Sequence, residues 1–306
     1  MTRFLLRRGL TLLVTIWAVF TVTFFLMRAV PGGPFDSDRS VPPAVERAIA
    51  AKYHLDDPIL KQYADQLTAA LGGDLGPSYR LVDYRVTEVI AEGLPRSLLL
   101  GGIALLLALS LGVAAGILAA VRPRGAIDAL VMTLSSLGLA LPNFVIAAAL
   151  VILCSFTLSW FPAAGWGGVR HLVLPSLCLS LPYAAAIARL LRTGLLESSA
   201  EDWFRTARSK GLGRREALSK HALRPGLPPV VSYLGPAAAG ILTGSLVVEQ
   251  VFAIPGLGSH FVQSALHRDY PLAMGVVLLY TILVGSMNLL ADLAIRWLDP
   301  RSGEIE

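Results

Sequence analysis

The sequence predicts an all-α protein that crosses a membrane six times. Of its 306 residues, 55% are hydrophobic and only 15% are charged, whereas soluble domains carry about 25% charged residues. The hydrophobic residues also gather in runs long enough for a membrane-spanning helix, which needs about 20 residues. Together these observations exclude a soluble enzyme, a disordered chain and a nucleic-acid-binding protein.

Six hydrophobic runs qualify as spans. The first, residues 9–30, follows three arginines and is too long for the apolar region of a cleaved signal peptide, so we expect it to remain as a helix. We expect the third run to break or kink at Pro142-Asn143, because proline removes a helical hydrogen bond. The second to sixth runs cover, in order, residues 95–121, 127–160, 172–191, 230–251 and 272–295.

The positions of the basic residues predict the orientation. The net charge of +5 is concentrated in segments that a cytoplasmic N-terminus places on one side: the N-terminal tail, the turn at 122–124 and the loop 193–229. The two short loops on the other side contain only Arg170 and Arg268 as basic residues. Because short cytoplasmic loops carry the excess of Lys and Arg, both termini are predicted to be cytoplasmic.

Three domains follow from these runs: an N-terminal tail with the first helix (1–30), an external insert (31–94) and a core of five spans (95–306). The insert is net acidic, with helical stretches expected at 43–53 and 58–71. It is either a cap packed on the helices or a docking site for an external partner.

The loop 193–229 is the most informative segment. Glu201 and Asp202 favour a helix start, and Gly211 favours its end; a second helix is expected to stop before Pro225. Trp203, Phe204 and Ala207 form an apolar stripe with a basic rim. Such a loop suits docking into a groove of another protein, or it lies on anionic lipid headgroups.

The spacing within this loop resembles the coupling loop of ABC importer permeases, whose pattern is Glu-Ala-Ala, three residues, Gly, nine residues, Ile, one residue, Leu-Pro. Ala207, Gly211 and Leu223 match it. Departures at Arg205-Thr206, His221 and Arg224 resemble the variant found in peptide importers.

Five further segments resemble landmarks of the same family. They are Arg3-Phe4-Leu5-Leu6-Arg7-Arg8, Lys52-Tyr53-His54-Leu55-Asp56-Asp57-Pro58, Phe252-Ala253-Ile254-Pro255-Gly256-Leu257-Gly258, His267-Arg268-Asp269-Tyr270 and Asp299-Pro300-Arg301. Over essentially its whole length, the chain therefore resembles the permease subunits of bacterial oligopeptide ABC importers, in the peptide and nickel permease family.

The resemblance implies a multi-pass inner-membrane subunit that forms half of a path for oligopeptides. It implies a second homologous permease, two cytoplasmic ATPase subunits and a periplasmic solute-binding protein as partners. The sequence has no phosphate-binding Gly-x-x-x-x-Gly-Lys-Ser/Thr motif, so ATP and Mg are expected on the ATPase subunits. The residues expected to couple to them are Arg205, Thr206, Ala207, Lys210, Gly211 and Leu212.

Polar residues inside the spans are candidates for the translocation path, because burying them in a membrane is costly: Asn143, Ser245, Glu249 and Asn288. Asp292 lies near the inner end of its span and is expected to reach the interface or pair with a neighbour. A Gly- and Pro-rich segment supplies candidates for an outer gate or a binding-protein contact, unless it is an ordinary loop: Pro255, Gly256, Gly258, Arg268, Asp269 and Tyr270.

Other interpretations remain at this point. The same architecture imports dipeptides, glutathione or nickel, and a stand-alone secondary transporter or channel is the competing class, although the sequence shows no repeat. No catalytic residues are expected, since no nucleophile elbow or His-Glu-x-x-His motif is present. No metal site is expected either, because His260 and His267 lack a third ligand. The pairs Gly112/Gly116 and Gly240/Gly244 indicate close helix packing or gate elements.

Overall fold

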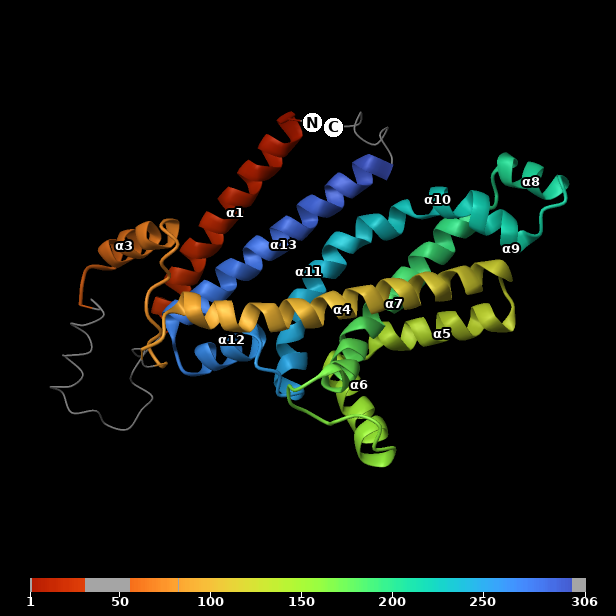
Figure 1. Ribbon diagram of the computed structural model, residues 1–306. Coiled ribbons are helices and arrows are strands. Elements are labelled where there is room, and N and C mark those ends of the chain that lie inside the picture. The colour runs from red at the N-terminus through yellow and green to blue at the C-terminus, as the bar shows by residue number, and fades with distance from the viewer. Residues whose placement is uncertain (1, 31–55, 82, 299–306) are drawn as a thin grey trace. The chain divides into compact units, whose positions relative to one another are not determined.

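A computed structural model describes residues 2–30, 56–81 and 83–298. In this part all the regular secondary-structure elements are helices (Figure 1), joined by turns and loops, and the one β-type contact is an isolated antiparallel bridge between Pro77 and Arg85. The predicted all-α fold class is therefore confirmed. The expected helix at 43–53, most of the motif at 52–58 and the motif at 299–301 lie outside the described residues.

The described residues contain five helices that are long and apolar enough to cross a membrane. They are α1 (Thr2–Ala29), α4 (Val86–Val121), α7 (Val169–Ser198), α11 (Pro228–Val251) and α13 (Tyr270–Leu298). A sixth candidate is the bent pair α5 (Ala126–Ala140) and α6 (Asn143–Leu150), which the π-helical segment η1 (Val151–Thr157) continues. Counting that pair as one span, the described residues contain the six spans predicted.

The third span is broken where the sequence predicts it. Leu141, with φ −84° and ψ 129°, leaves the helical region, as the residue before a proline tends to do. A new helix begins directly after Pro142, whose carbonyl accepts hydrogen bonds from the backbone N–H groups of Val145 (3.0 Å) and Ile146 (3.2 Å). The chain turns by 111° at this point.

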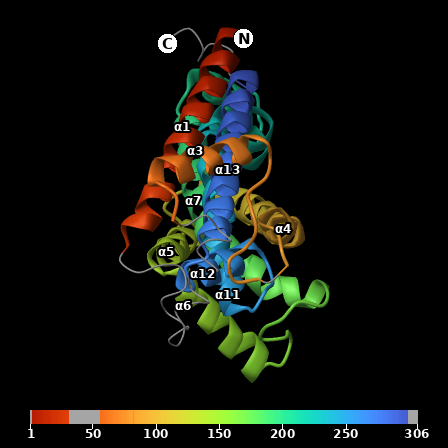
Figure 2. The same cartoon turned by 90° about the vertical axis from the view of Figure 1, so that its left-hand side faces the viewer.

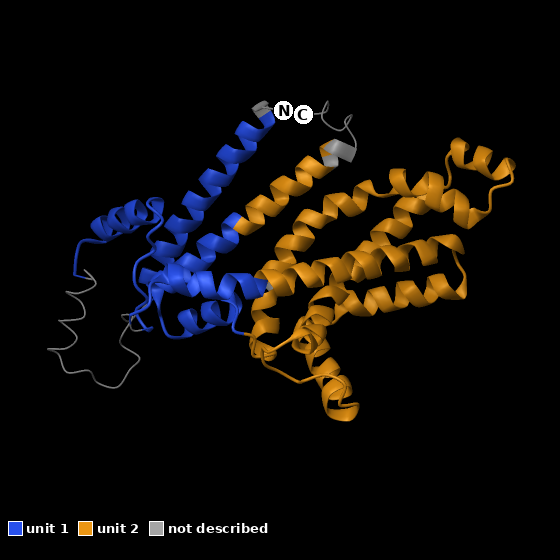
Figure 3. Ribbon diagram, in the orientation of Figure 1, with its two compact units in different colours: residues 1–97, 255–282 blue, residues 98–254, 283–306 orange. Residues whose placement is uncertain are grey.

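The chain divides into two compact units (Figure 3). The first comprises the described parts of residues 1–97 and 255–282, including α3 (Ile59–Leu71) and α12 (Leu257–Leu266). Its core joins Phe20 and Phe24 of α1 to Met274 of α13, and Tyr63 of α3 packs edge-on against both phenylalanines. Thus α3 lies across α1 and the first part of α13 (Figure 2). This packing agrees with the interpretation of the insert as a cap on the helices.

The second unit comprises residues 98–254 and the described part of 283–306, and α7 is its central helix. Helix α7 contacts α5, α6 and α11 as well as the loop that follows it. Glycines allow α4 to approach α7 closely: a Cβ atom on Gly112 would lie 2.7 Å from Ile187 Cβ. Gly240 of α11 likewise packs against the Tyr183 hydroxyl. These contacts support the helix-packing interpretation of the glycine pairs; the surroundings of Gly244 lie outside the described residues.

Candidate functional site

Helix α8 (Asp202–Ser209) begins and ends where the sequence predicts. The Glu201 carbonyl accepts hydrogen bonds from the N–H groups of Phe204 (3.1 Å) and Arg205 (3.3 Å). At the other end, Gly211 has φ +91°, a left-handed conformation that glycine adopts without steric cost and that commonly ends helices. Gly213 is instead extended (φ −61°, ψ 150°) and precedes the next helix.

The second helical segment is longer than expected. It consists of α9 (Arg214–Ala217), the π-helical η2 (Leu218–Ala222) and α10 (Leu223–Gly226). The expected stop before Pro225 is therefore wrong, because this residue lies inside α10. Pro225 lies one residue before the end of this segment, so the N–H that it lacks removes only a hydrogen bond of the last turn.

The apolar stripe of α8 faces this chain itself. Phe204 is 3% exposed and Ala207 is 8% exposed, and the core around Phe204 includes Ala217 and Leu218. Only Trp203, at 39% exposure, remains accessible. The expectation that the stripe forms an apolar docking knob is therefore corrected: the short helices beneath α8 cover most of it.

The outward face of α8 is polar and basic. Besides Asp202 and Trp203, the side chains that α8 and the following turn expose belong to Arg205, Thr206, Arg208, Ser209 and Lys210, so the bases outnumber the acid. Arg205 forms an ion pair with Asp202 at 3.5 Å between two highly exposed side chains, which contributes little to stability. This face suits a partner that presents carboxylates. We call residues 202–226 the coupling loop hereafter, after the loop of ABC importer permeases that its sequence resembles; the contact with an ATPase that this name implies is a prediction.

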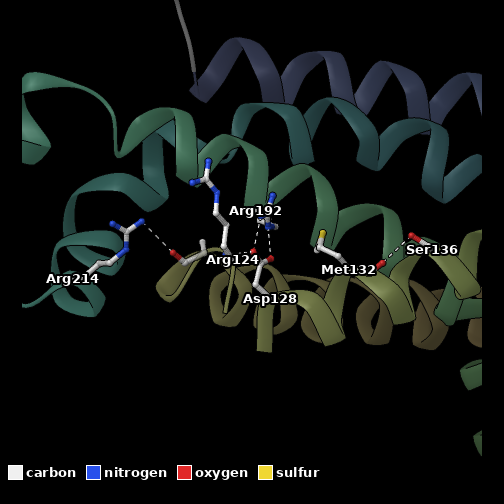
Figure 4. Close-up of polar contacts among 7 residues, drawn as sticks. Arg124, Asp128, Met132, Ser136, Arg192 and Arg214 are labelled. Carbon is white, nitrogen blue, oxygen red and sulfur yellow. Dashed lines mark hydrogen bonds and ion pairs between the residues drawn. The ribbon is translucent and has the colours of Figure 1, made fainter. Parts of the chain in front are cut away.

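Two attachments hold the coupling loop to the spans. Gly194 of α7 and Gly226 of α10 touch through their backbones: a Cβ atom on Gly194 would collide with the Gly226 carbonyl oxygen, and one on Gly226 would lie 3.1 Å from the Gly194 carbonyl carbon. Arg214 donates from Nη2 to the carbonyl oxygen of Ala120, at the end of α4 (3.4 Å, Figure 4). Sequence reasoning missed both contacts, because neither has a signal within its own segment.

The predicted path residues lie on three different helices. Asn143 begins α6, and its backbone carbonyl accepts a hydrogen bond from the Cys178 thiol (3.2 Å). Ser245 and Glu249 of α11 are fully buried, and the Ser245 hydroxyl donates to the Leu242 carbonyl (2.7 Å). Asn288 of α13 packs against Gly235 of α11. Their assignment to a path stays a prediction.

In the predicted outer segment, Asp269 is a buried acceptor of several hydrogen bonds. The side chain is 1% exposed. It accepts hydrogen bonds from the Ser78 hydroxyl and from the N–H groups of Tyr79 (3.1 Å), Arg80 (3.3 Å) and Leu272 (3.3 Å). Asp269 thus caps the start of α13 and ties residues 78–80 to it. Its expected role in an outer gate or a binding-protein contact stays a prediction.

The other residues of this segment differ in accessibility. Pro255 is exposed, and its carbonyl accepts a hydrogen bond from Arg96 (2.9 Å). Gly256 and Gly258 are buried, whereas Arg268 and Tyr270 are partly exposed. The role of all five residues as a gate or a contact stays a prediction.

We expect Asp269→Ala to lower the free energy of unfolding by about 2–3 kcal/mol, because several backbone N–H groups lose their acceptor. Asp269→Asn keeps an oxygen and should cost less. Thermal unfolding of the purified protein in detergent measures both. Asp65→Ala on α3, where the side chain is exposed, is the matched control, and equal melting temperatures for Asp269→Ala and wild type would show that the cap contributes nothing.

Comparisons with known protein families match nearly the whole chain. The family described as "Binding-protein-dependent transport system inner membrane component" matches residues 112–304. A second family, "Binding-prot-dependent transport system membrane comp, N-term", matches residues 1–97. The first match includes the coupling loop, and the second includes α3.

Permease proteins of several bacteria are similar to this chain over nearly their full length. The oligopeptide transport system permease protein OppB of Salmonella typhimurium is 42% identical over 98% of this chain and 99% of that protein, and that of Haemophilus influenzae is 43% identical over the same shares. The dipeptide transport system permease protein DppB of Bacillus subtilis is 41% identical over 98% of each chain. In fold, the chain is similar to a subunit in an inward-facing structure of the MetNI methionine ABC transporter, with a TM-score of 0.57 at 19% identity, covering 69% of this chain and 97% of that one.

Proposed function

The chain belongs to the family of binding-protein-dependent transport system inner membrane components, and from that premise we propose that it forms half of the path by which an ATP-driven importer carries oligopeptides into the cell. As a member of this family, it is a permease subunit of the inner membrane. The proposal adds the cargo, the source of energy and the partner subunits.

The choice of cargo is carried by one observation, the 42% identity over 98% of this chain to permease subunits of oligopeptide transport systems. Dipeptide is the alternative that a specific observation favours, because a dipeptide permease is 41% identical over the same share. Glutathione and nickel rest only on the resemblance of the permease pattern.

The proposed partners are a second homologous permease, two ATPase subunits that bind ATP and Mg, and a periplasmic binding protein that delivers the peptide. We assign the coupling loop to the ATPase contact. Its exposed residues Arg205, Thr206, Lys210 and Gly211 would meet the ATPase, and the less exposed Ala207 and Leu212 would hold α8 in place from below. The basic character of the exposed face supports this assignment.

The proposal is tested in the full complex, reconstituted with its binding protein in lipid vesicles. ATP hydrolysis is measured with peptides of two, three and five residues and with nickel. We expect the five-residue peptide to stimulate hydrolysis most and nickel not at all. Stimulation by the dipeptide or nickel alone would reassign the cargo, and a lone homo-oligomer that transports without ATPase subunits would contradict the proposed class.

A further inference from the structure

A buried ion pair joins α5 to α7 beside the coupling loop. Asp128 of α5 is 3% exposed. Both of its oxygens accept hydrogen bonds from Arg192 of α7, Oδ1 from Nε at 2.5 Å and Oδ2 from Nη2 at 2.7 Å. The backbone N–H of Arg124, in the turn between α4 and α5, also donates to Oδ2 at 2.7 Å (Figure 4).

The location of this pair connects it to the loop. Arg192 lies two positions before Gly194, the residue of α7 that packs against Gly226 of the coupling loop. Arg214 of the same loop reaches the end of α4, just before the turn whose Arg124 binds Asp128. Three spans and the coupling loop therefore meet within one network of polar and backbone contacts.

Geometry, rather than stability, is the reason to assign a role to this pair. A buried ion pair is weak evidence for stability, because removing both charges from water offsets much of their attraction. A bidentate arginine–carboxylate contact, in contrast, fixes the distance and the orientation of the two groups. Such a contact restricts the rotation of α7 about its own axis relative to α5.

We propose that Asp128 is a positioning residue for transport: through Arg192 it holds the end of α7 against α5, so that a displacement of the coupling loop moves both helices together. Helix α7 also packs against α5 and α6, but without the pair this packing could slip, and less of the loop's motion would pass from α7 to the bent span of α5 and α6. This inference rests on the proposed function, since it assumes that the coupling loop is where ATPase motion enters.

The test measures peptide transported per ATP hydrolysed in the reconstituted complex, with Asp128→Asn, Arg192→Gln, Asp128→Glu and the double variant Asp128→Asn/Arg192→Gln. If the pair had only a structural role, its loss would change the amount of assembled complex. The ratio of peptide transported to ATP hydrolysed does not depend on that amount. We expect each single neutralising variant to lower the ratio by on the order of tenfold, the magnitude typical of coupling between sites. Asp128→Glu, which keeps a carboxylate, should recover part of it.

The double variant decides between positioning and stability. It leaves no unpaired buried charge, so it should fold and assemble even if the single variants do not. A ratio that stays low in the double variant supports the proposal, and a wild-type ratio overturns it by showing that only the unpaired charge was harmful. Asp57→Asn, which breaks the more exposed pair with Lys61 (2.9 Å), is the control and should leave the ratio unchanged. A wild-type complex without peptide-dependent ATP hydrolysis would contradict the proposed function instead.

Discussion

Gly194→Ala is expected to reduce peptide transport by at least tenfold while ATP hydrolysis continues. The added Cβ atom meets the backbone carbonyl of Gly226, which cannot rotate away as a flexible side chain would. Helices α7 and α10 must then separate, at a cost of about 1–3 kcal/mol for such overpacking. Because α10 is part of the coupling loop, the loop should lose its fixed position on α7. Transport and hydrolysis by the reconstituted complex measure this uncoupling.

The control for this variant is Gly102→Ala. Gly102 is also a helical glycine, on α4, but nothing lies within 4 Å of the position that its Cβ atom would occupy. Alanine is favoured over glycine in a helix by about 1 kcal/mol, so this variant should transport as well as wild type. If Gly194→Ala also transports normally, the contact between α7 and α10 does not transmit motion.

Ala207→Glu should uncouple transport from hydrolysis even more severely. Ala207 is 8% exposed and packs in the small core beneath α8. A carboxylate there has no partner among the apolar side chains around it, and burying an unpaired charge costs several kcal/mol. The rearrangement of lowest free-energy cost is for α8 to separate from α9. This moves the basic face of α8 away from the ATPase subunit that we propose as its partner. We expect the spans to assemble, because the change lies outside them.

The same substitution at Ala200 provides the comparison. Ala200 lies in the turn that precedes α8 and is exposed, so a glutamate there remains hydrated. Transport per ATP should be near the wild-type value for Ala200→Glu and strongly reduced for Ala207→Glu. Equal loss in both variants would mean that the added negative charge, and not the lost packing of α8, is responsible.

The features that the sequence predicted correctly have local causes. The break at Pro142 follows from the geometry of a single proline, and the end of α8 follows from the positive φ of Gly211. The five long helices each contain a long, mainly apolar stretch. Each cause lies within a few residues of its effect.

Apart from the helix stop wrongly expected before Pro225, which is a local error, the main features that were missed or wrong depend on contacts between different segments of the chain. Asp128 and Arg192 are 64 positions apart, and Asp269 meets Ser78 across 191 positions. The apolar stripe of α8 was identified correctly, but the sequence could not show that α9 and η2 would cover it. Periodicity shows which face of a helix is apolar; it does not show whether the chain itself or another protein covers that face.

The central claim, that the exposed face of α8 meets the ATPase subunits, is tested most directly by photo-cross-linking in intact membranes. A photoreactive amino acid is placed at Thr206, on the exposed face of α8, and in a separate variant at Thr68, on the exposed side of α3. We predict a cross-link to an ATPase subunit from position 206 and none from position 68. A complex that assembles and transports without a cross-link from position 206, or one that cross-links from position 68, would contradict the claim.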